Sequence, residues 1–275
     1  MKIKLIVILA AVLALTGACN KGAPGNAGSR SNEPYTIEVG GSTSVTPLME
    51  LFAEEYQKSK PNIKININGT GSGDGINNTG KLYQIGMSSR ELTPAEQGMG
   101  LKETVVAIDG IAVIMNKNSP INNLSIEQIR DIYTGAVTDW SQVSGGTKSG
   151  RIAVISREEG SGTRGAFEEL VGFQGRLVAG ANESTSTGAI KAGIAQNTEA
   201  IGYISLGSVD DTIKAIAVGG VSAANDNVKN GSYRIARPFI VLAGNNLHAE
   251  SAAFIDWMLG SEGQAVVSRS WISVK

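Results

Sequence analysis

Short apolar runs rich in β-branched residues alternate along the chain with segments of helical periodicity. This alternation is typical of an α/β protein with largely parallel sheets, and 275 residues are enough for two lobes. No period of about 20–50 residues recurs, which excludes a solenoid or a propeller. The predicted strands are Tyr35–Val39, Ile63–Ile67, Val105–Ile108, Ile111–Met115, Ile152–Ser156, Ile201–Ile204, Lys214–Val218 and Phe239–Ala243.

Capping signals predict where the helices begin and end. Ser125 and Gln128 form a capping box ahead of an apolar helical pattern, and Gly135 stops that helix. The other predicted helices start at Thr46, follow "GSGTR" (Gly160–Arg164), and span Ala249–Arg269 with a break near Gly260–Gly263.

Residues 1–18 have the pattern of an export signal. Lys2 and Lys4 precede an apolar run, Leu5–Leu15, that is too short to span a bilayer. The stretch "LTGAC" that follows resembles a bacterial lipobox, in which Cys19 is lipidated and becomes the mature N-terminus. The alternative is an ordinary signal peptide with a chance cysteine. Residues 19–34 lack hydrophobic periodicity and are expected to be a flexible tether.

The composition excludes several classes of protein. With Cys19 as an anchor, no thiol remains for a disulfide, and one cysteine and one histidine do not make a zinc site. Beyond residue 18 the chain has 22 basic and 25 acidic residues and no basic run, so nucleic acid is not an expected partner. Aromatic residues are 5% of the chain, fewer than a sugar-binding cleft normally uses.

Four loops share a composition of glycine and small hydroxyl residues. They are "GGSTSVTP" (Gly40–Pro47), "GTGSGDG" (Gly69–Gly75), "GMSSREL" (Gly86–Leu92) and "REEGSGTR" (Arg157–Arg164). In open α/β sheets, ligands bind at the carboxyl ends of strands, beside helix N-termini with unpaired N–H groups. One such loop is more often a plain turn or cap, but four converging loops predict a small, dry oxyanion site.

The acidic balance of the chain means that local groups must hold the anion. Removing water from a phosphate-like ion costs roughly 20 kcal/mol or more on an idealised scale. A charge-assisted hydrogen bond returns about 1.5–3 kcal/mol net, so about eight to ten donors are expected around one ion. Helix dipoles and one or two guanidiniums are the available sources.

The catalytic motifs that we looked for in the sequence are incomplete or absent. "GINNTGKL" (Gly75–Leu82) resembles a nucleotide P-loop, but Leu82 replaces the magnesium-binding Ser or Thr. No G-x-S-x-G motif is present. His248 is the single histidine, and we expect it at the surface or at a helix cap rather than in a Ser-His-Asp triad. The chain is therefore not expected to be an enzyme, and it needs no cofactor.

The motifs together resemble the phosphate-binding lipoproteins that supply phosphate ABC importers. The resemblance extends from Tyr35 to Lys275 and rests on seven blocks in order: "GGSTSVTPLMELFAEEY", "GTGSGDGI", "IGMSSREL", "LSIEQIRDIYTGAVTDW", "SREEGSGTRGAFEEL", "AIGYISLG" and "YRIARPF". It implies two α/β lobes joined by a two-stranded hinge with the ligand in the cleft. The first lobe would span 35–112 and 206–275 and the second 113–205, with crossings near Gly110–Met115 and Ile201–Gly207.

The resemblance also implies a set of phosphate ligands. Arg157 would supply a salt link, while the helix start beside it supplies N–H and hydroxyl donors. In one branch of the family an aspartate accepts the proton of bound phosphate, but Ser89 stands at that position here. Asp74 is an alternative acceptor, or simply a solvent-facing residue at a helix start. The implied ligands are Thr43, Ser44, Ser72, Ser89, Arg157, Ser161, Gly162 and Thr163.

The expected function is a high-affinity phosphate receptor that delivers its ligand to the permease subunits of an ABC importer. The protein would be exported and monomeric. A palmitate-bearing lipid on Cys19 would anchor it to the outer side of the cytoplasmic membrane or in the periplasm. A receptor for sulfate or another tetrahedral oxyanion is a close alternative, because sulfate needs no proton acceptor. A secreted hydrolase, or an interaction module that has lost the pocket, are alternatives of other classes.

Overall fold

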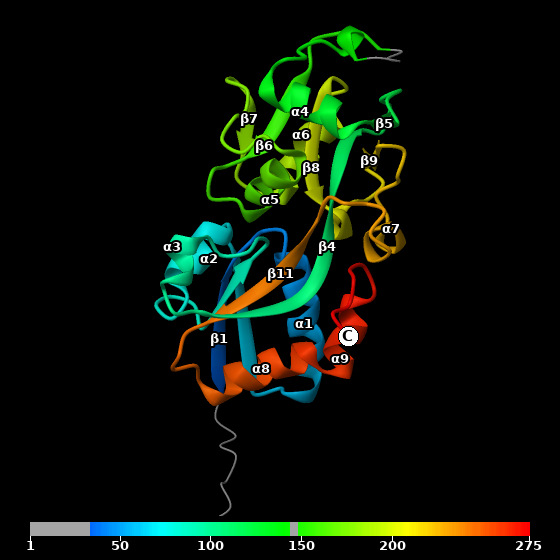
Figure 1. The fold of residues 1–275 in the computed structure, drawn as a ribbon. Helices are drawn as coiled ribbons and strands as arrows, with labels where there is room; N and C mark the ends of the chain where they lie inside the picture. The colour runs from blue at the N-terminus through cyan, green and yellow to red at the C-terminus, as the bar shows by residue number, and fades with distance from the viewer. Residues whose placement is uncertain (1–33, 144–147) are drawn as a thin grey trace, which may run out of the picture. The chain divides into compact units, whose positions relative to one another are not determined.

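A computed structural model describes residues 34–143 and 148–275; Cys19, the predicted signal segment and residues 19–33 of the predicted tether lie outside the described residues. Strands and helices alternate as an α/β protein requires (Figure 1). The main strands are β1 (Tyr35–Gly41), β2 (Ile63–Gly69), β3 (Ile85–Ser88), β4 (Lys102–Asn116), β6 (Ala153–Arg157), β8 (Ala200–Ser205) and β11 (Ala236–Ala243). Four short strands are β5 (Asn123–Leu124), β7 (Asn182–Ser184), β9 (Ile213–Ala215) and β10 (Ala217–Val218).

Helices surround this framework. The helices are α1 (Thr46–Ser59), α2 (Ser72–Asn78), α3 (Pro94–Gln97), α4 (Ile126–Thr134), α5 (Gly162–Val171), α6 (Thr187–Gln196), α7 (Asn225–Lys229), α8 (Ala249–Leu259) and α9 (Ser261–Val267). Two 3-10 turns, η1 (Trp140–Gln142) and η2 (Leu206–Ser208), complete the described elements. None of the helices within residues 34–143 and 148–275 has the length and apolarity needed to cross a membrane.

Nine strands of the described chain form one mixed sheet, in the order β2-β1-β3-β11-β4-β8-β6-β7, with β9 beside β4. The pairs of β1 with β2 and β3 are parallel, as are those of β6 with β7 and β8. The central pairs, in which β4 and β11 take part, are antiparallel. Each end of the sheet is therefore a parallel α/β unit, and β4 and β11 join the two units (Figure 1).

The partner of β4 changes in the middle of the strand. Residues 102–110 pair with β11, and from Ile111 onward the strand pairs with β8. The sequence predicted two strands separated by Asp109 and Gly110, but the structure joins them into one. The reason is that both halves find a partner strand directly, so no turn is needed between them. We call the segment around this partner change, together with Ala236 and Arg237 of β11, the hinge.

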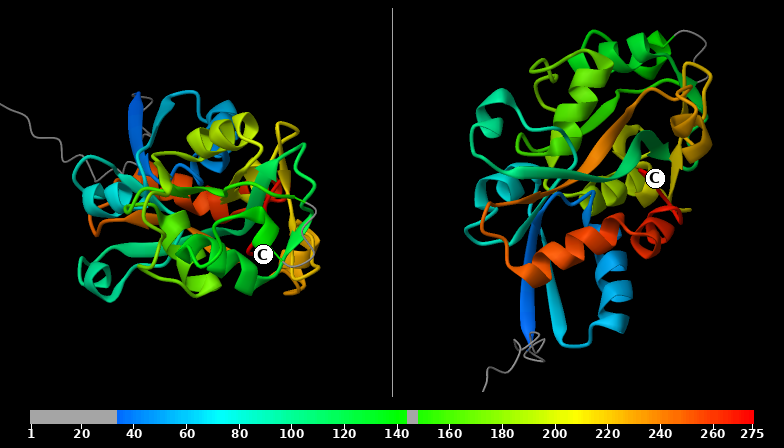
Figure 2. Two further views of the ribbon diagram at one scale, coloured as in Figure 1. Left: turned by 90° about the horizontal axis from the view of Figure 1, so that it is seen from above. Right: turned by 60° about the horizontal axis from the view of Figure 1, so that its bottom comes forward.

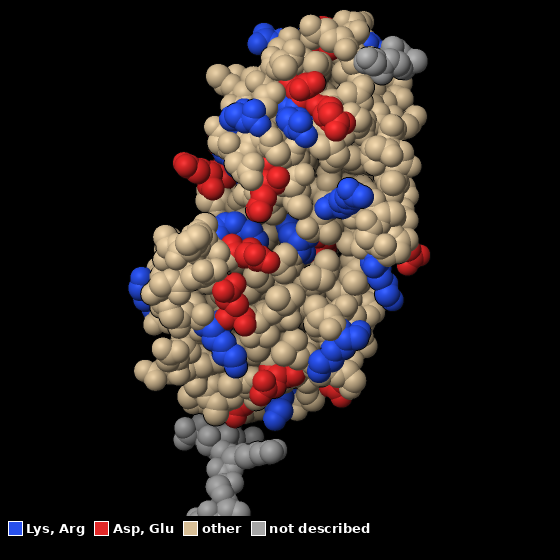
Figure 3. All heavy atoms as spheres, viewed as in Figure 1, with Lys and Arg blue, Asp and Glu red and all other residues tan. Residues whose placement is uncertain are grey.

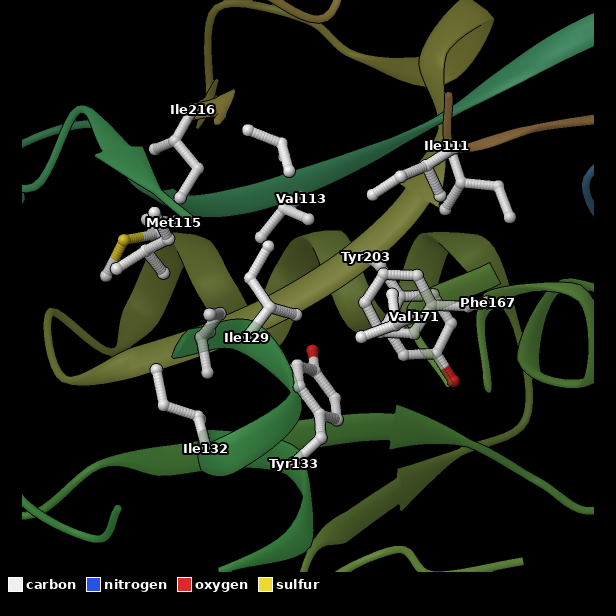
Figure 4. Packing of buried hydrophobic residues seen from close by; sticks show 14 of the residues in the cluster. Ile111, Val113, Met115, Ile129, Ile132, Tyr133, Phe167, Val171, Tyr203 and Ile216 are labelled. Carbon is white, nitrogen blue, oxygen red and sulfur yellow. The ribbon is translucent and has the colours of Figure 1, made fainter. Parts of the chain in front are cut away.

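Two hydrophobic cores define two lobes. The first lobe packs α1, α8 and α9 on the sheet formed by β1, β3 and β11, and its buried residues include Phe52, Tyr56 and Phe254. Figure 2 shows α8 and α9 lying across α1. The second lobe packs α4 and α5 against β4, β6 and β8. Figure 4 shows its core, where the Phe167 and Tyr203 rings stack with centroids 4.0 Å apart.

The division between the lobes differs from the prediction in one respect. The resemblance implied that residues 206–275 belong to the first lobe, yet Ile216, Val218 and Val228 pack in the core of the second lobe. The physical reason is strand pairing, since β9 pairs with the second half of β4 and β10 pairs with β5. The chain thus returns to the first lobe through β11, and not near Ile201–Gly207.

The local capping predictions are confirmed. The Ser125 side chain accepts from the Gln128 N–H in a complete capping box, and Gly135 ends α4 in the left-handed conformation with φ 79°. Helix α1 begins at Thr46, and the last helical segment is interrupted at Gly260 between α8 and α9. These signals depend on residues a few positions apart, so sequence alone is sufficient to read them.

Candidate functional site

The four hydroxyl-rich loops converge where the two lobes meet. Three belong to the first lobe and follow β1, β2 and β3, and the fourth follows β6 in the second lobe and leads into α5. A fifth segment, Ser184–Thr187 between β7 and α6, joins them. This segment was not predicted from the sequence, although its composition, "STST", is of the same kind.

Six buried side chains form what we call the hydroxyl cluster: Ser42, Ser44, Ser72, Ser89, Thr163 and Thr187. The most exposed of them, Thr187, retains 6% of its surface. Ser89 lies at the centre, because its Oγ accepts from Ser42 Oγ at 2.9 Å and shares hydrogen bonds with Ser72 and Thr163, each at 3.3 Å. So many hydroxyls concentrated in a dry interior form a site rich in neutral donors.

The hydroxyl cluster is assembled from both lobes. Ser44 of the first lobe shares hydrogen bonds with Thr163 at 2.8 Å and Thr187 at 3.2 Å, both from the second lobe. Backbone contact adds to this, since the N–H of Gly73 donates to the carbonyl of Gly160 at 3.0 Å. The site therefore exists as a unit only when the lobes lie together.

The start of α5 lies directly against the first-lobe hydroxyls of the cluster. A Cβ on Gly162 would lie 2.3 Å from Ser72 Oγ and 2.8 Å from Ser89 Oγ, so only glycine fits there without a shift. The N–H groups of Gly162 and Thr163 have no hydrogen-bond acceptor among the described residues. Unpaired N–H groups at a helix N-terminus favour an anion.

Thr43 and Ser161, two other predicted ligands, lie at the edge of the cluster. Thr43 Oγ1 is 3.4 Å from Thr187 Oγ1, and it lines a hollow of about 410 Å³ with Thr46, Thr187 and Lys191. Ser161 is the N-cap of α5, and its side chain accepts from the N–H of Arg164 at 3.3 Å. Its hydroxyl therefore stabilises the helix start that carries Gly162 and Thr163.

Arg157 is buried beside the site, but its hydrogen bonds lead away from it. Its guanidinium donates to both carboxylate oxygens of Glu158, at 2.8 and 2.7 Å, and to the carbonyl of Ser184 at 3.2 Å. No hydrogen bond joins Arg157 to the hydroxyl cluster. In the structure Arg157 is paired with Glu158, and its link to phosphate stays a prediction.

A second guanidinium, Arg237 of β11, contacts the cluster directly. Its Nη2 donates to Thr163 Oγ1 at 3.0 Å, and its Nε donates to the carbonyl of Ser89 at 3.0 Å. Its Nη1 donates to Asp109 Oδ2 at 2.6 Å in an ion pair that is almost fully buried. Arg237 lies in the block "YRIARPF", but no role for it was predicted from the sequence.

The electrostatics of this pair follow from its burial. Burial raises the pKa of Asp109 to about 6, while the charge of Arg237 and the Ser205 hydroxyl hydrogen bond oppose the shift. Burial also lowers the pKa of Arg237, and Asp109 opposes that change. The nearby charge of Arg157 acts in the same direction as burial, so the two guanidiniums are close enough to repel each other.

Asp74 does not face the cluster. Its Oδ2 accepts from Thr70 at 2.6 Å and from Tyr83 at 2.9 Å, and its Oδ1 accepts from Asn78 at 2.7 Å. These hydrogen bonds, that of Thr70 foremost, lower the pKa of Asp74. These contacts hold the start of α2, and the proton-acceptor role, one of the two alternatives that the sequence left open for Asp74, stays a prediction.

The described residues, 34–143 and 148–275, hold no cluster of three or more His, Cys, Asp or Glu side chains that could bind a metal ion. His248 is the N-cap of α8, where its Nδ1 accepts from the N–H of Glu250 at 3.2 Å, as the sequence suggested. Figure 3 shows acidic and basic side chains interspersed on one face, with no field of a single sign.

Two α/β lobes joined by crossing strands, with buried donors between them, define the type II periplasmic binding protein fold. A model of the PBP superfamily domain matches residues 23–262. A phosphate ABC transporter substrate-binding protein of Clostridium perfringens, solved with bound phosphate, is 44% identical, with a TM-score of 0.85 over 88% of this chain and 100% of that one.

Two further relatives agree with this assignment. An ABC-type phosphate transport receptor of Vibrio cholerae is 33% identical, with a TM-score of 0.72 over 87% of this chain and 100% of that one. The phosphate-binding protein PstS of Borreliella burgdorferi is 29% identical over 257 residues, which are 88% of this chain and 90% of that protein. The chain belongs to the PBP superfamily and, within it, to the substrate-binding proteins of phosphate ABC transporters.

Proposed function

We propose that the protein is a receptor that binds inorganic phosphate in the hydroxyl cluster and delivers it to the permease of an ABC importer. The observation that carries this proposal is the convergence of buried hydroxyls from both lobes on the free N–H groups of Gly162 and Thr163. This arrangement supplies directed donors without a net charge, which suits a small oxyanion stripped of its water. The names of the relatives support phosphate as that ion.

The predicted ligands fall into two groups under this proposal. Ser44, Ser72, Ser89 and Thr163 would contact phosphate through hydroxyls, and Gly162 and Thr163 through N–H groups. Thr43, Ser161 and Arg157 would border the ion. Hydroxyl oxygens accept as well as donate, so a serine or threonine of the cluster can take the proton of the hydrogenphosphate ion. A carboxylate in the pocket is then not needed for phosphate binding.

Isothermal titration calorimetry with inorganic phosphate tests the site. We expect Thr163→Val to weaken binding by about 2 kcal/mol or more, because it removes a hydroxyl at the centre of the cluster. Thr43→Val and Arg157→Ala, at the border of the ion, are each also expected to weaken binding by about 2 kcal/mol or more. Thr212→Val is the control, since Thr212 is exposed and its hydroxyl contacts only Asp210. Unchanged binding in Thr163→Val would remove the cluster from the site.

A receptor for sulfate or another tetrahedral oxyanion is the second candidate. It is favoured by one observation: both oxygens of Asp74 are engaged outside the cluster, and those of Asp109 are engaged by Arg237 and Ser205. Competition calorimetry at neutral pH decides between the two. The phosphate proposal predicts that excess sulfate leaves the phosphate titration unchanged, whereas displacement by sulfate would support the second candidate.

We further propose that the protein is exported and held at the membrane by a lipid on Cys19, as a monomer without catalytic activity. The support is the lipobox-like "LTGAC" stretch after an apolar run. Metabolic labelling of the full chain with an alkyne-tagged palmitate should mark the wild type. The Cys19→Ser variant should remain unlabelled, and equal labelling of both would contradict the anchor.

A further inference from the structure

We infer that Arg237 couples the hinge to the anion site, and that its guanidinium holds the two lobes together around bound phosphate. This inference rests on the proposed function, because it concerns how that site closes. Arg237 is a positioning residue in this account, acting through Thr163 and Ser89. It was not among the residues that the sequence predicted.

The position of Arg237 in the sheet is the first support. It lies on β11 directly opposite Asp109 of β4, one residue pair from the point where β4 changes partner. Asp109 also accepts from the Ser205 hydroxyl at the end of β8, at 2.8 Å. The ion pair therefore lies where three strands of the hinge meet, and both side chains are 2% exposed or less.

The three nitrogens of Arg237 contact three different parts of the fold. Nη1 pairs with Asp109 in the hinge, Nε donates to the Ser89 carbonyl in the first lobe, and Nη2 donates to Thr163 in the second lobe. A guanidinium is rigid and planar, so these three directions are fixed relative to one another. A lysine ammonium has the same charge but is a single point on a flexible stem, and it cannot reproduce this fork.

The hydrogen bond to Thr163 depends on closure. Thr163 belongs to α5 of the second lobe, whereas the Ser89 carbonyl belongs to the first lobe, so both bonds can form together only when the lobes meet. A bond that exists only in the closed state slows release of the ligand more than it affects capture. Because Asp109 neutralises Arg237, the guanidinium adds directed donors and little long-range attraction for the incoming ion.

Stopped-flow kinetics of phosphate binding to the full mature protein test the inference. We expect Arg237→Lys to raise the dissociation rate at least about tenfold while the association rate stays within about twofold. The control is Arg164→Lys, because Arg164 is also paired, with Glu168 and Glu183, but all its partners lie in the second lobe. The control should leave the dissociation rate unchanged even if it lowers the melting temperature.

A second variant serves if Arg237→Lys does not fold. The double variant Asp109→Asn/Arg237→Gln replaces the buried ion pair by neutral amides, which removes the cost of an unpaired buried charge. It should show the same increase in dissociation rate. A wild-type dissociation rate in either variant would overturn the coupling, as would a loss confined to the association rate. A wild-type protein that does not bind phosphate would instead overturn the proposed function itself.

Discussion

The two buried arginines beside the hydroxyl cluster differ in what they hold together. Arg157, at the corner between β6 and α5, finds its partners in Glu158, the next residue, and in the neighbouring β7 segment. Arg237, in the hinge, finds its partners on β4, in the loop after β3, and at the start of α5. The corner is thus fixed by contacts within the second lobe, whereas the hinge is fixed by contacts to both lobes.

Both guanidiniums are neutralised by a carboxylate, which decides how an anion is held. Arg157 pairs with Glu158 and Arg237 with Asp109, so neither presents an unbalanced charge to the cluster. The negative charge of phosphate must then be met by hydroxyls, N–H groups and the dipole of α5. This is consistent with a chain whose formal net charge of −1 offers no long-range attraction.

The largest expected effect is the loss of the hinge carboxylate. Asp109→Asn leaves Arg237 charged in an interior without a counter-ion, and we expect the free energy of unfolding to fall by about 3–5 kcal/mol. Glu158→Gln is the matched change at the corner. The Glu158 side chain is 28% exposed, so water can replace part of its interaction with the buried Arg157, and the expected loss is smaller, about 1–2 kcal/mol. Urea unfolding at pH 8, which is above the pKa of about 6 for Asp109, measures the free energy of unfolding of both variants.

Equal losses in these two variants would contradict the distinction between hinge and corner. The measurement is made at pH 8 because a neutral Asp109 would already leave Arg237 without a counter-charge in the wild type. At pH 8 the carboxyl is ionised in the folded protein, and the comparison then measures the removal of the charge itself.

A smaller effect is expected from filling the space between the corner and the cluster. In Gly162→Ala the new Cβ would displace the hydroxyls of Ser72 and Ser89, and we expect phosphate affinity to fall by about 2 kcal/mol. Gly160→Ala is the control in the same loop, because a Cβ there meets nothing within 4 Å. Calorimetry should find the control unchanged, and a similar loss in both variants would indicate a general disturbance of the loop.

The smallest effect concerns a third arginine pair, next to Ser89 but nearer the surface. The hydrogen bond from Arg90 lowers the pKa of Glu96 to about 2, and the Thr93 cap assists. A lowered pKa means that the stabilisation is present above about pH 4.5 and is lost as the pH falls towards 2. Glu96→Gln should therefore lower the free energy of unfolding by about 1 kcal/mol at pH 7.

The difference between Glu96→Gln and the wild type should disappear as the pH approaches 2. Glu91→Gln provides the comparison, since Glu91 is exposed and its carboxylate has no hydrogen bond with any residue that the structure describes. A difference for Glu96→Gln that persists unchanged at low pH would mean that the carboxylate charge is not its source.

Sequence was sufficient wherever a feature depends on neighbouring residues. The α/β alternation, the capping box at Ser125 and the N-cap role of His248 are of this kind. The composition of the loops also indicated which segments converge. The remaining features depend on tertiary contacts: nothing local shows that Asp109 and Gly110 continue a strand, because the continuity comes from β11 and β8.

Arg237 and Asp74 are two residues whose contacts could not be predicted from the sequence. Arg237 lies within a strand, in no glycine-rich loop, and its partners are 74 to 148 residues away, so no local pattern marks it. Asp74 lies within a predicted loop, yet Thr70 and Asn78, four residues to either side, occupy its oxygens. The sequence left open whether Asp74 accepts a proton from the ligand or faces solvent, and in the structure local hydrogen bonds occupy both of its carboxylate oxygens.

A crystal structure of the protein saturated with phosphate would show whether hydroxyls and N–H groups from both lobes together enclose one tetrahedral ion. We expect tetrahedral density about 2.7–3.2 Å from the hydroxyls of Ser44, Ser89 and Thr163, with the Gly162 N–H in the same range. Phosphate bound elsewhere, with the six hydroxyls still bonded to one another, would contradict it.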